Sequence, residues 1–116
     1  MRSWPRRVPE AQWPSGDYRG VAQIDATAED LARSLSVAFD QYIENGLGFV
    51  LTVPLRTESG VYFLLTDYVD SPDGRYTTIE MIHNSEIEAQ LGDVLSTLGI
   101  ARSELHWIND NARGAT

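Results

Sequence analysis

The middle of the chain carries the feature that most restricts the fold: three runs of alternating apolar and polar side chains separated by short turn sequences. The runs cover Phe49–Arg56, Val61–Val69 and Arg75–His83. The intervening Glu58-Ser59-Gly60 and Ser71-Pro72-Asp73-Gly74 have turn composition, because proline presets φ and glycine tolerates positive φ. Strands joined by such short turns are antiparallel neighbours. The sequence therefore predicts a three-stranded antiparallel meander.

Two segments with helical periodicity flank this meander. The first is predicted to run from an N-cap at Thr27 to a C-cap at Gly46, with two acids in its first turn. The second is predicted to open at Ser85, which would form a capping box with Glu88, and to end at Gly99. The apolar positions of the first helix are three to four residues apart. They are Leu31, Leu35, Ala38, Phe39, Tyr42 and Ile43.

The expected fold class is α+β, a three- to four-stranded antiparallel sheet with two helices packed on one face. Residues 17–25 fit either a short strand or an extended lead-in to the first helix, and Ser103–Ile108 fits one further strand. Each predicted helix has a single apolar stripe, and both stripes can be buried on the same side of one sheet. The side chains expected beneath the helices are Leu51, Val53, Phe63, Leu65, Ile79 and Met81.

The chain of 116 residues has the length of one domain. Residues 1–16 contain three of the five prolines and are predicted to form an extended arm. Residues 17–110 are predicted to form the single α+β domain, and residues 111–116 a mobile polar tail. Trp4 and Trp13 each precede a proline, so we expect them to anchor the arm, either on the domain's own surface or on a partner.

The charge of the chain restricts its partners. Lysine is absent, and from Val8 onward six arginines stand against seventeen acids, a balance of −11 over 109 residues. Such a surface repels nucleic acids and anionic membranes and attracts basic proteins. The chain has no apolar stretch near the length of a membrane span and no secretory signal, so we expect a soluble, cytoplasmic protein.

The sequence contains no motif that specifies a reaction. Cysteine is absent, and His83 and His106 have no serine or acid at a diagnostic spacing. Asp67, Asp70 and Asp73 are clustered, but their spacing does not match a calcium-binding loop. We therefore expect no metal, no cofactor and no catalytic residue.

The face of the meander opposite the helices is the better candidate for a functional surface. Alternation places three tyrosines, several threonines and one glutamate on this face, a composition common at protein interfaces. The same side chains also stabilise antiparallel sheets through cross-strand pairs, and dimerisation through this face is a third alternative. The predicted partner-binding residues are Tyr62, Tyr68, Tyr76, Glu80, Asp67, Asp70 and Asp73.

These observations favour a non-enzymatic protein-binding module. The specific hypothesis is a bacterial immunity or antitoxin protein, which neutralises a basic toxin by presenting carboxylates where the toxin expects phosphates. One alternative is a secretion-chaperone-like protein that binds an effector. Another is a small-ligand domain or enzyme subunit that uses His83 or His106.

The excess of acids leads to a first prediction. The thermal stability of the protein should rise between low and moderate salt, because screening relieves self-repulsion more than it weakens the few ion pairs. Melting temperatures across a sodium chloride series measure this effect. A flat or falling series would mean that the acids are individually paired.

Overall fold

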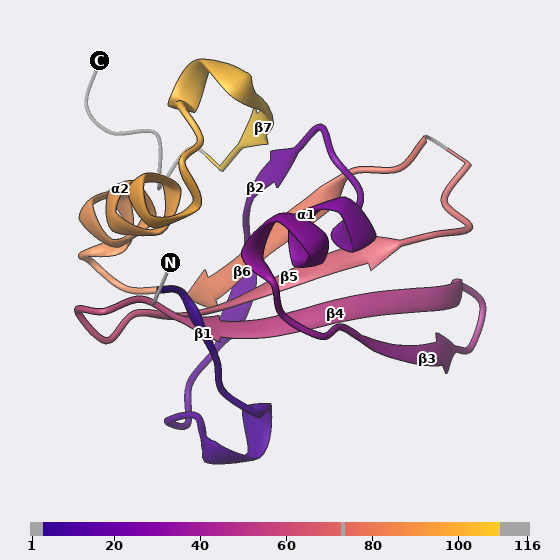
Figure 1. Cartoon of the computed structure of the whole chain (residues 1–116), viewed down its shortest axis with the longest axis horizontal. Coiled ribbons are helices and arrows are strands. Elements are labelled where there is room, and N and C mark those ends of the chain that lie inside the picture. The colour runs from indigo at the N-terminus through magenta and orange to yellow at the C-terminus, as the bar shows by residue number, and fades with distance from the viewer. Residues whose placement is uncertain (1–3, 73, 110–116) are drawn as a thin grey trace.

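The structure, a computed structural model, describes residues 4–72 and 74–109 and shows an α+β fold (Figure 1). Within these residues, two α-helices and two short 3₁₀ turns accompany one seven-stranded antiparallel sheet. The elements are β1 (Arg6–Arg7), η1 (Glu10–Gln12), β2 (Tyr18–Ile24), α1 (Ala28–Leu35), β3 (Asp40–Glu44), β4 (Gly48–Arg56), β5 (Tyr62–Tyr68), β6 (Thr77–Ile82), α2 (Ile87–Leu98), η2 (Arg102–Glu104) and β7 (Leu105–Ile108).

The predicted meander is confirmed as β4, β5 and β6. Val53 lies opposite Leu65, and Leu65 lies opposite Ile79, so the three core-facing rows are in register. The sheet has more strands than the three or four expected. Its order is β1-β4-β5-β6-β2-β7, and β3 also pairs with β4. Of the two alternatives for residues 17–25, the structure has the strand, β2, and the segment Ser103–Ile108 contains β7.

The prediction of one helix from Thr27 to Gly46 is wrong in its second half. Thr27 does cap α1, since its hydroxyl accepts a hydrogen bond from the backbone N–H of Asp30 at 3.2 Å. The helix ends at Leu35, because Ser36 takes a left-handed conformation with φ 57°. Residues 40–44 then form β3 along the edge of β4, where a ladder of interstrand hydrogen bonds outweighs helical propensity.

The second helix differs from its prediction at one end only. Its N-cap is Glu86, whose side chain makes no capping hydrogen bond, so the capping box between Ser85 and Glu88 is absent. The side-chain oxygen of Asn84 instead accepts the N–H of Glu86 at 2.8 Å. The helix ends at Gly99 with φ 74°, as expected. Neither α-helix in the described part of the chain has the length and apolar run of a membrane span.

Both helices lie on one side of the sheet, and the N-terminal segment with η1 lies on the other (Figure 1). The six side chains predicted to lie beneath the helices are all buried. All of them except Leu51 belong to one core cluster with Val21, Ala22, Ile24, Ala32, Leu35, Leu55, Ile87, Leu91, Val94 and Leu95. Strand β4 is buried on both faces over residues 50–55, because the helices cover one face of the sheet and the N-terminal segment lies on the other.

The N-terminal segment belongs to the fold and is not a simple extended arm. Its β1 pairs with Leu55 and Arg56 of β4, next to the residues of β4 that pair with β3. Pro54 lies between these two pairings, at a position where β4 needs no N–H donor. The Pro54 carbonyl accepts a hydrogen bond from Val8 at 3.1 Å.

A buried carboxylate fixes α1 to the sheet. Asp67 of β5 is 0% exposed and accepts the N–H of Ala28, the first residue of α1, at 2.9 Å. The guanidinium of Arg75 lies 2.6 Å from Asp67 and also pairs with Glu29. The hydrogen bonds that Arg75 donates to Asp67 and then to Glu29 raise its pKa. The start of the helix is thereby held at the end of β5.

This arrangement predicts a large effect of Asp67→Ala on stability. The change leaves the buried N–H of Ala28 without its partner and, among the described residues, leaves the guanidinium of Arg75 paired with Glu29 alone, which should cost about 2–3 kcal/mol. The matched control is Asp25→Ala, which removes an exposed acid and should change stability by no more than about 0.5 kcal/mol. Urea denaturation of both variants measures the difference. Equal effects would show that Asp67 does not anchor α1.

Candidate functional site

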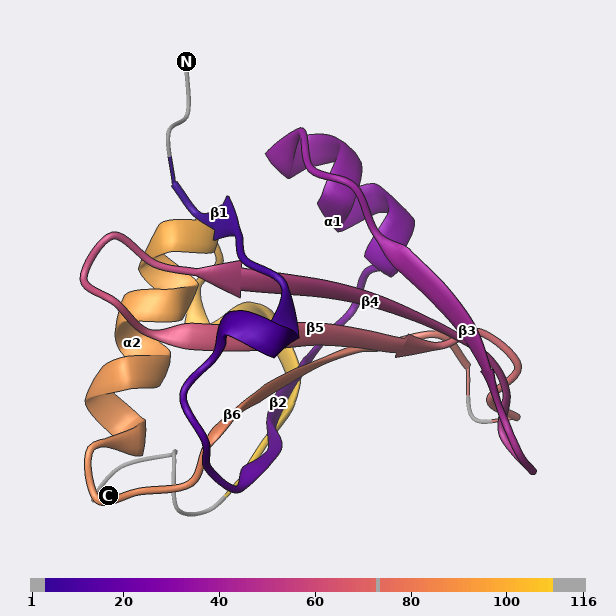
Figure 2. The ribbon, with the colours of Figure 1, turned by 90° about the horizontal axis from the view of Figure 1, so that it is seen from below.

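The largest exposed apolar side chains gather on one hairpin. Residues 39–49, which we call the apolar hairpin, consist of Phe39, β3, a tight turn and the start of β4. Five of its side chains are between 40% and 70% exposed: Phe39, Tyr42, Ile43, Leu47 and Phe49. In the described residues, Trp107 on β7 is the one other exposed large apolar side chain. Figure 2 shows the tip of this hairpin pointing away from α2.

The side chains of the apolar hairpin occupy both faces of the sheet. Ile43 lies directly opposite Phe49 in the register of β3 and β4, so these two share the face that carries the helices. Tyr42 lies opposite Val50 on the other face. Val50 also lies opposite Tyr68 of β5. Tyr42 and Tyr68 therefore flank the buried Val50 on this face, one from each neighbouring strand.

Carboxylates surround these two tyrosines. Burial, and after it the charges of Glu80 and Glu44, raises the pKa of Tyr68. Burial, and then Glu44 and Glu80, likewise raises the pKa of Tyr42. The pKa of Glu10, on η1, is raised by burial first and by Glu80 next. This end of the sheet therefore combines apolar surface with negative charge.

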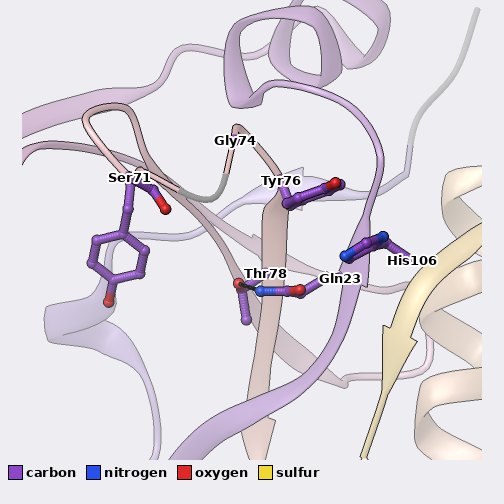
Figure 3. A pocket seen from close by; sticks show the side chains of 7 residues that line it. Gln23, Ser71, Gly74, Tyr76, Thr78 and His106 are labelled. Carbon is purple, nitrogen blue, oxygen red and sulfur yellow. Dashed lines mark hydrogen bonds between the residues drawn. The ribbon is translucent and has the colours of Figure 1, made fainter.

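Two hollows share Tyr68 and Ser71 in their linings, and the smaller of the two also includes residues of the hairpin turn. The smaller, of about 340 Å³, lies between the hairpin turn at Gly46 and Leu47 and the loop that follows β5. The larger, of about 440 Å³, is lined by neutral side chains (Figure 3). They are Gln23, Tyr68, Ser71, Tyr76, Thr78 and His106, together with Gly74.

Tyr76 and His106 form one wall of the larger hollow. Their rings stack with centroids 3.8 Å apart and an interplanar angle of 10° (Figure 3). On its floor, the amide of Gln23 donates to the hydroxyl of Thr78 at 3.3 Å. Among the described residues, the lining of the hollow offers hydroxyl, amide and imidazole groups and contains no carboxylate or guanidinium.

The three tyrosines predicted to form one exposed patch lie in separate surroundings. Tyr62 is half-buried against the indole of Trp13, with ring centroids 5.7 Å apart. Tyr68 lies beside the apolar hairpin, and Tyr76 stacks on His106. All three tyrosines are partly buried, and the N-terminal segment covers the Tyr62 end of this face.

Both tryptophans of this segment contact the domain itself. The indole N–H of Trp13 donates to the carbonyl of Val8 at 2.7 Å, and its ring also contacts Tyr18. The guanidinium of Arg6 lies 4.3 Å from the centre of the Trp4 ring, and that of Arg56 lies at 5.5 Å. Of the two roles considered for these anchors, the structure places both on the protein's own surface.

The acidic residues predicted to contact a partner also lie in different surroundings. Asp67 is fully buried in the α1 anchor, so the expectation that it contacts a partner fails in this conformation. Asp70 is exposed and accepts the backbone N–H of Phe49 at 2.9 Å, which ties it to the apolar hairpin. Glu80 is half-buried and accepts a hydrogen bond from the hydroxyl of Thr66. Asp73 lies outside the described residues.

The two histidines do not form a common site. His106 is on β7, and β2 lies between β7 and β6, the strand that His83 follows. The backbone N–H of His83 donates to the carbonyl of Asp17, near the start of β2. Among the described residues, no group of three or more histidines and acids could hold a metal ion.

Sequence reasoning missed the apolar hairpin because it placed Phe39, Tyr42 and Ile43 on the buried face of a helix. The signal that indicates the hairpin is Asn45-Gly46, a dipeptide typical of turns between strands. Gly46 adopts φ 81° in this turn, which favours glycine at that position.

No family model, no curated protein and no solved structure matches this chain.

Proposed function

We propose that this protein is a small acidic module that binds a basic partner protein through the apolar hairpin and carries out no catalysis. The observation that supports this most directly is the concentration of five exposed large apolar side chains on residues 39–49. Clustered apolar surface of this kind marks interaction sites in soluble proteins. Tyrosine and phenylalanine are also enriched at the energetic centres of protein interfaces.

Charge supports a basic partner. The formal net charge of the chain is −8, Glu44 lies on the hairpin, and Asp70 accepts a hydrogen bond from the hairpin residue Phe49. Charges near an interface accelerate association with an oppositely charged protein, whereas buried apolar contacts supply most of the affinity. The apolar hairpin thus combines both contributions at one end of the sheet.

The specific form of the proposal is a bacterial immunity or antitoxin protein that neutralises a basic toxin such as a nuclease. Carboxylates at the binding surface would occupy the toxin's phosphate-binding groups, and the apolar side chains would hold the complex together. A secretion-chaperone-like protein would use the same surface for an effector. An adjacent gene for a large toxin favours the first form, and one for a secreted effector favours the second.

The double variant Ile43→Ser/Leu47→Ser tests this proposal. Both side chains are exposed, so the free energy of unfolding should change by no more than about 1 kcal/mol. Affinity for a basic toxin-like protein encoded beside the gene should fall by about 2 kcal/mol or more, because interface anchors are lost. Titration calorimetry and thermal melts measure the two quantities.

The control for this experiment is Trp107→Ser, which removes an exposed apolar side chain from β7, at the opposite edge of the sheet. It should leave the affinity within about threefold of wild type, or about 0.7 kcal/mol. If the control loses binding and the hairpin variant retains it, the binding surface lies elsewhere.

The larger hollow favours a second function, the binding of a small neutral ligand. Its lining of amide, hydroxyl and imidazole groups beside two stacked rings suits a hydroxyl-rich molecule such as a sugar. This candidate uses His106 and not His83, because only His106 lines the hollow.

A ligand screen separates this second function from the first. Addition of neutral mono- and disaccharides should perturb the amide resonances around Tyr76 and His106 in NMR spectra, and His106→Ala should weaken the effect at least tenfold. His83→Ala is the control and should leave it unchanged. Spectra that do not change with any of these sugars would contradict sugar binding at this hollow.

A further inference from the structure

We propose that the outer edge of β3 binds an extended basic segment of the partner protein as an additional antiparallel strand. This inference rests on the proposed function and specifies how the partner is held. Within the described residues, β3 pairs with β4 alone, so its other edge has no neighbouring strand. Unpaired strand edges are templates for such strand addition.

The hydrogen bonds of Phe49 show which backbone groups of β3 point outward. The N–H of Phe49 donates to Asp70, and its carbonyl accepts from Val69, so both groups point toward β5 and away from β3. Ile43, directly opposite Phe49, is therefore in a non-hydrogen-bonded pair with it. The N–H and C=O of Ile43 consequently point to the free edge, and those of Gln41, two residues earlier, do the same.

The side chains along β3 select a basic segment. Asp40 and Glu44 lie on the same face as Tyr42, two residues to either side of it. Asp40 is 55% exposed beside its salt bridge to Arg7 at 2.5 Å, and Glu44 has no ion pair among the described residues. Opposite charges directly across strands stabilise pairing. The incoming strand should therefore place a basic side chain across from each acid and an apolar one across from Ile43.

A second copy of this chain fits the same edge poorly. Antiparallel pairing of two β3 strands over all five residues, centred on Tyr42, would set Asp40 of each copy against Glu44 of the other. Like charges directly opposite one another destabilise a strand pair. Two chains of net charge −8 also repel each other at long range. The charge pattern of β3 thus favours a foreign basic strand over self-association.

Synthetic peptides test the proposal without knowledge of the natural partner. The probe is a capped peptide with the central sequence Arg-Val-Tyr-Thr-Arg, whose residues face Glu44, Ile43, Tyr42, Gln41 and Asp40 in that order. Its charge-reversed counterpart, Glu-Val-Tyr-Thr-Glu, should bind at least tenfold more weakly at low salt. Equal binding of the two peptides, measured by fluorescence anisotropy, would overturn the role of charge.

Backbone methylation tests strand pairing separately from charge. N-methylation of the valine and the threonine of the probe removes the two N–H groups that would bond to Ile43 and Gln41, and should weaken binding at least tenfold. N-methylation of the central tyrosine, whose N–H points away from β3, should leave binding within about threefold. Equal effects of the two modifications would overturn the strand-addition geometry.

A variant of the protein provides the reciprocal test. Gln41→Pro removes one outward N–H while it retains every apolar and acidic side chain of the hairpin, and it should weaken the probe at least tenfold relative to Gln41→Thr. If Gln41→Pro does not fold, the methylated peptides decide the question.

The proposed function and this inference can fail independently. If the natural basic partner binds through the apolar hairpin but is unaffected by Gln41→Pro, strand addition is wrong and the proposed function stands. If the partner does not depend on Ile43 and Leu47 while the probe binds as expected, the edge binds basic strands but the hairpin is not the partner surface.

Discussion

The architecture depends on the two edges of β4. One edge pairs with β5, and the other is shared end to end by β1 and β3. A nine-residue strand with half of one edge unpaired would leave its backbone groups unsatisfied beside the core. Residues 40–44 pair with these groups as β3, although their periodicity predicts a helix. Because they form an edge strand, Tyr42 and Ile43 are exposed and not buried on a helix face.

The pairing of β3 with β4 requires that α1 begin and end at fixed residues. The buried carboxylate of Asp67 holds the first turn of α1 against the end of β5, with Arg75 beside it. Ser36, with its left-handed backbone, ends the helix after eight residues. The chain is then directed to β4 over only four residues. A buried acid at one end and a short connection at the other thus set the position of the apolar hairpin.

The two faces of the sheet have different roles. The face beneath the helices forms the main core, and the N-terminal segment covers part of the other through Trp13 and Tyr62. The N-terminal segment also reaches β3, where Arg7 pairs with Asp40. It nevertheless leaves the five large apolar side chains of the hairpin exposed.

The sequence by itself determined the meander, the N-terminus of α1, the C-terminus of α2 and the acidic character of the surface, because each depends on local patterns or on composition. It predicted Tyr68 and Asp70 as partner-binding residues, but it could not place the apolar hairpin beside them. Only tertiary structure decided that residues 40–44 are a strand, that Asp67 is buried, and that Trp13 covers Tyr62. These outcomes depend on competition between distant segments for one sheet edge and one sheet face, and no local pattern records the result of that competition.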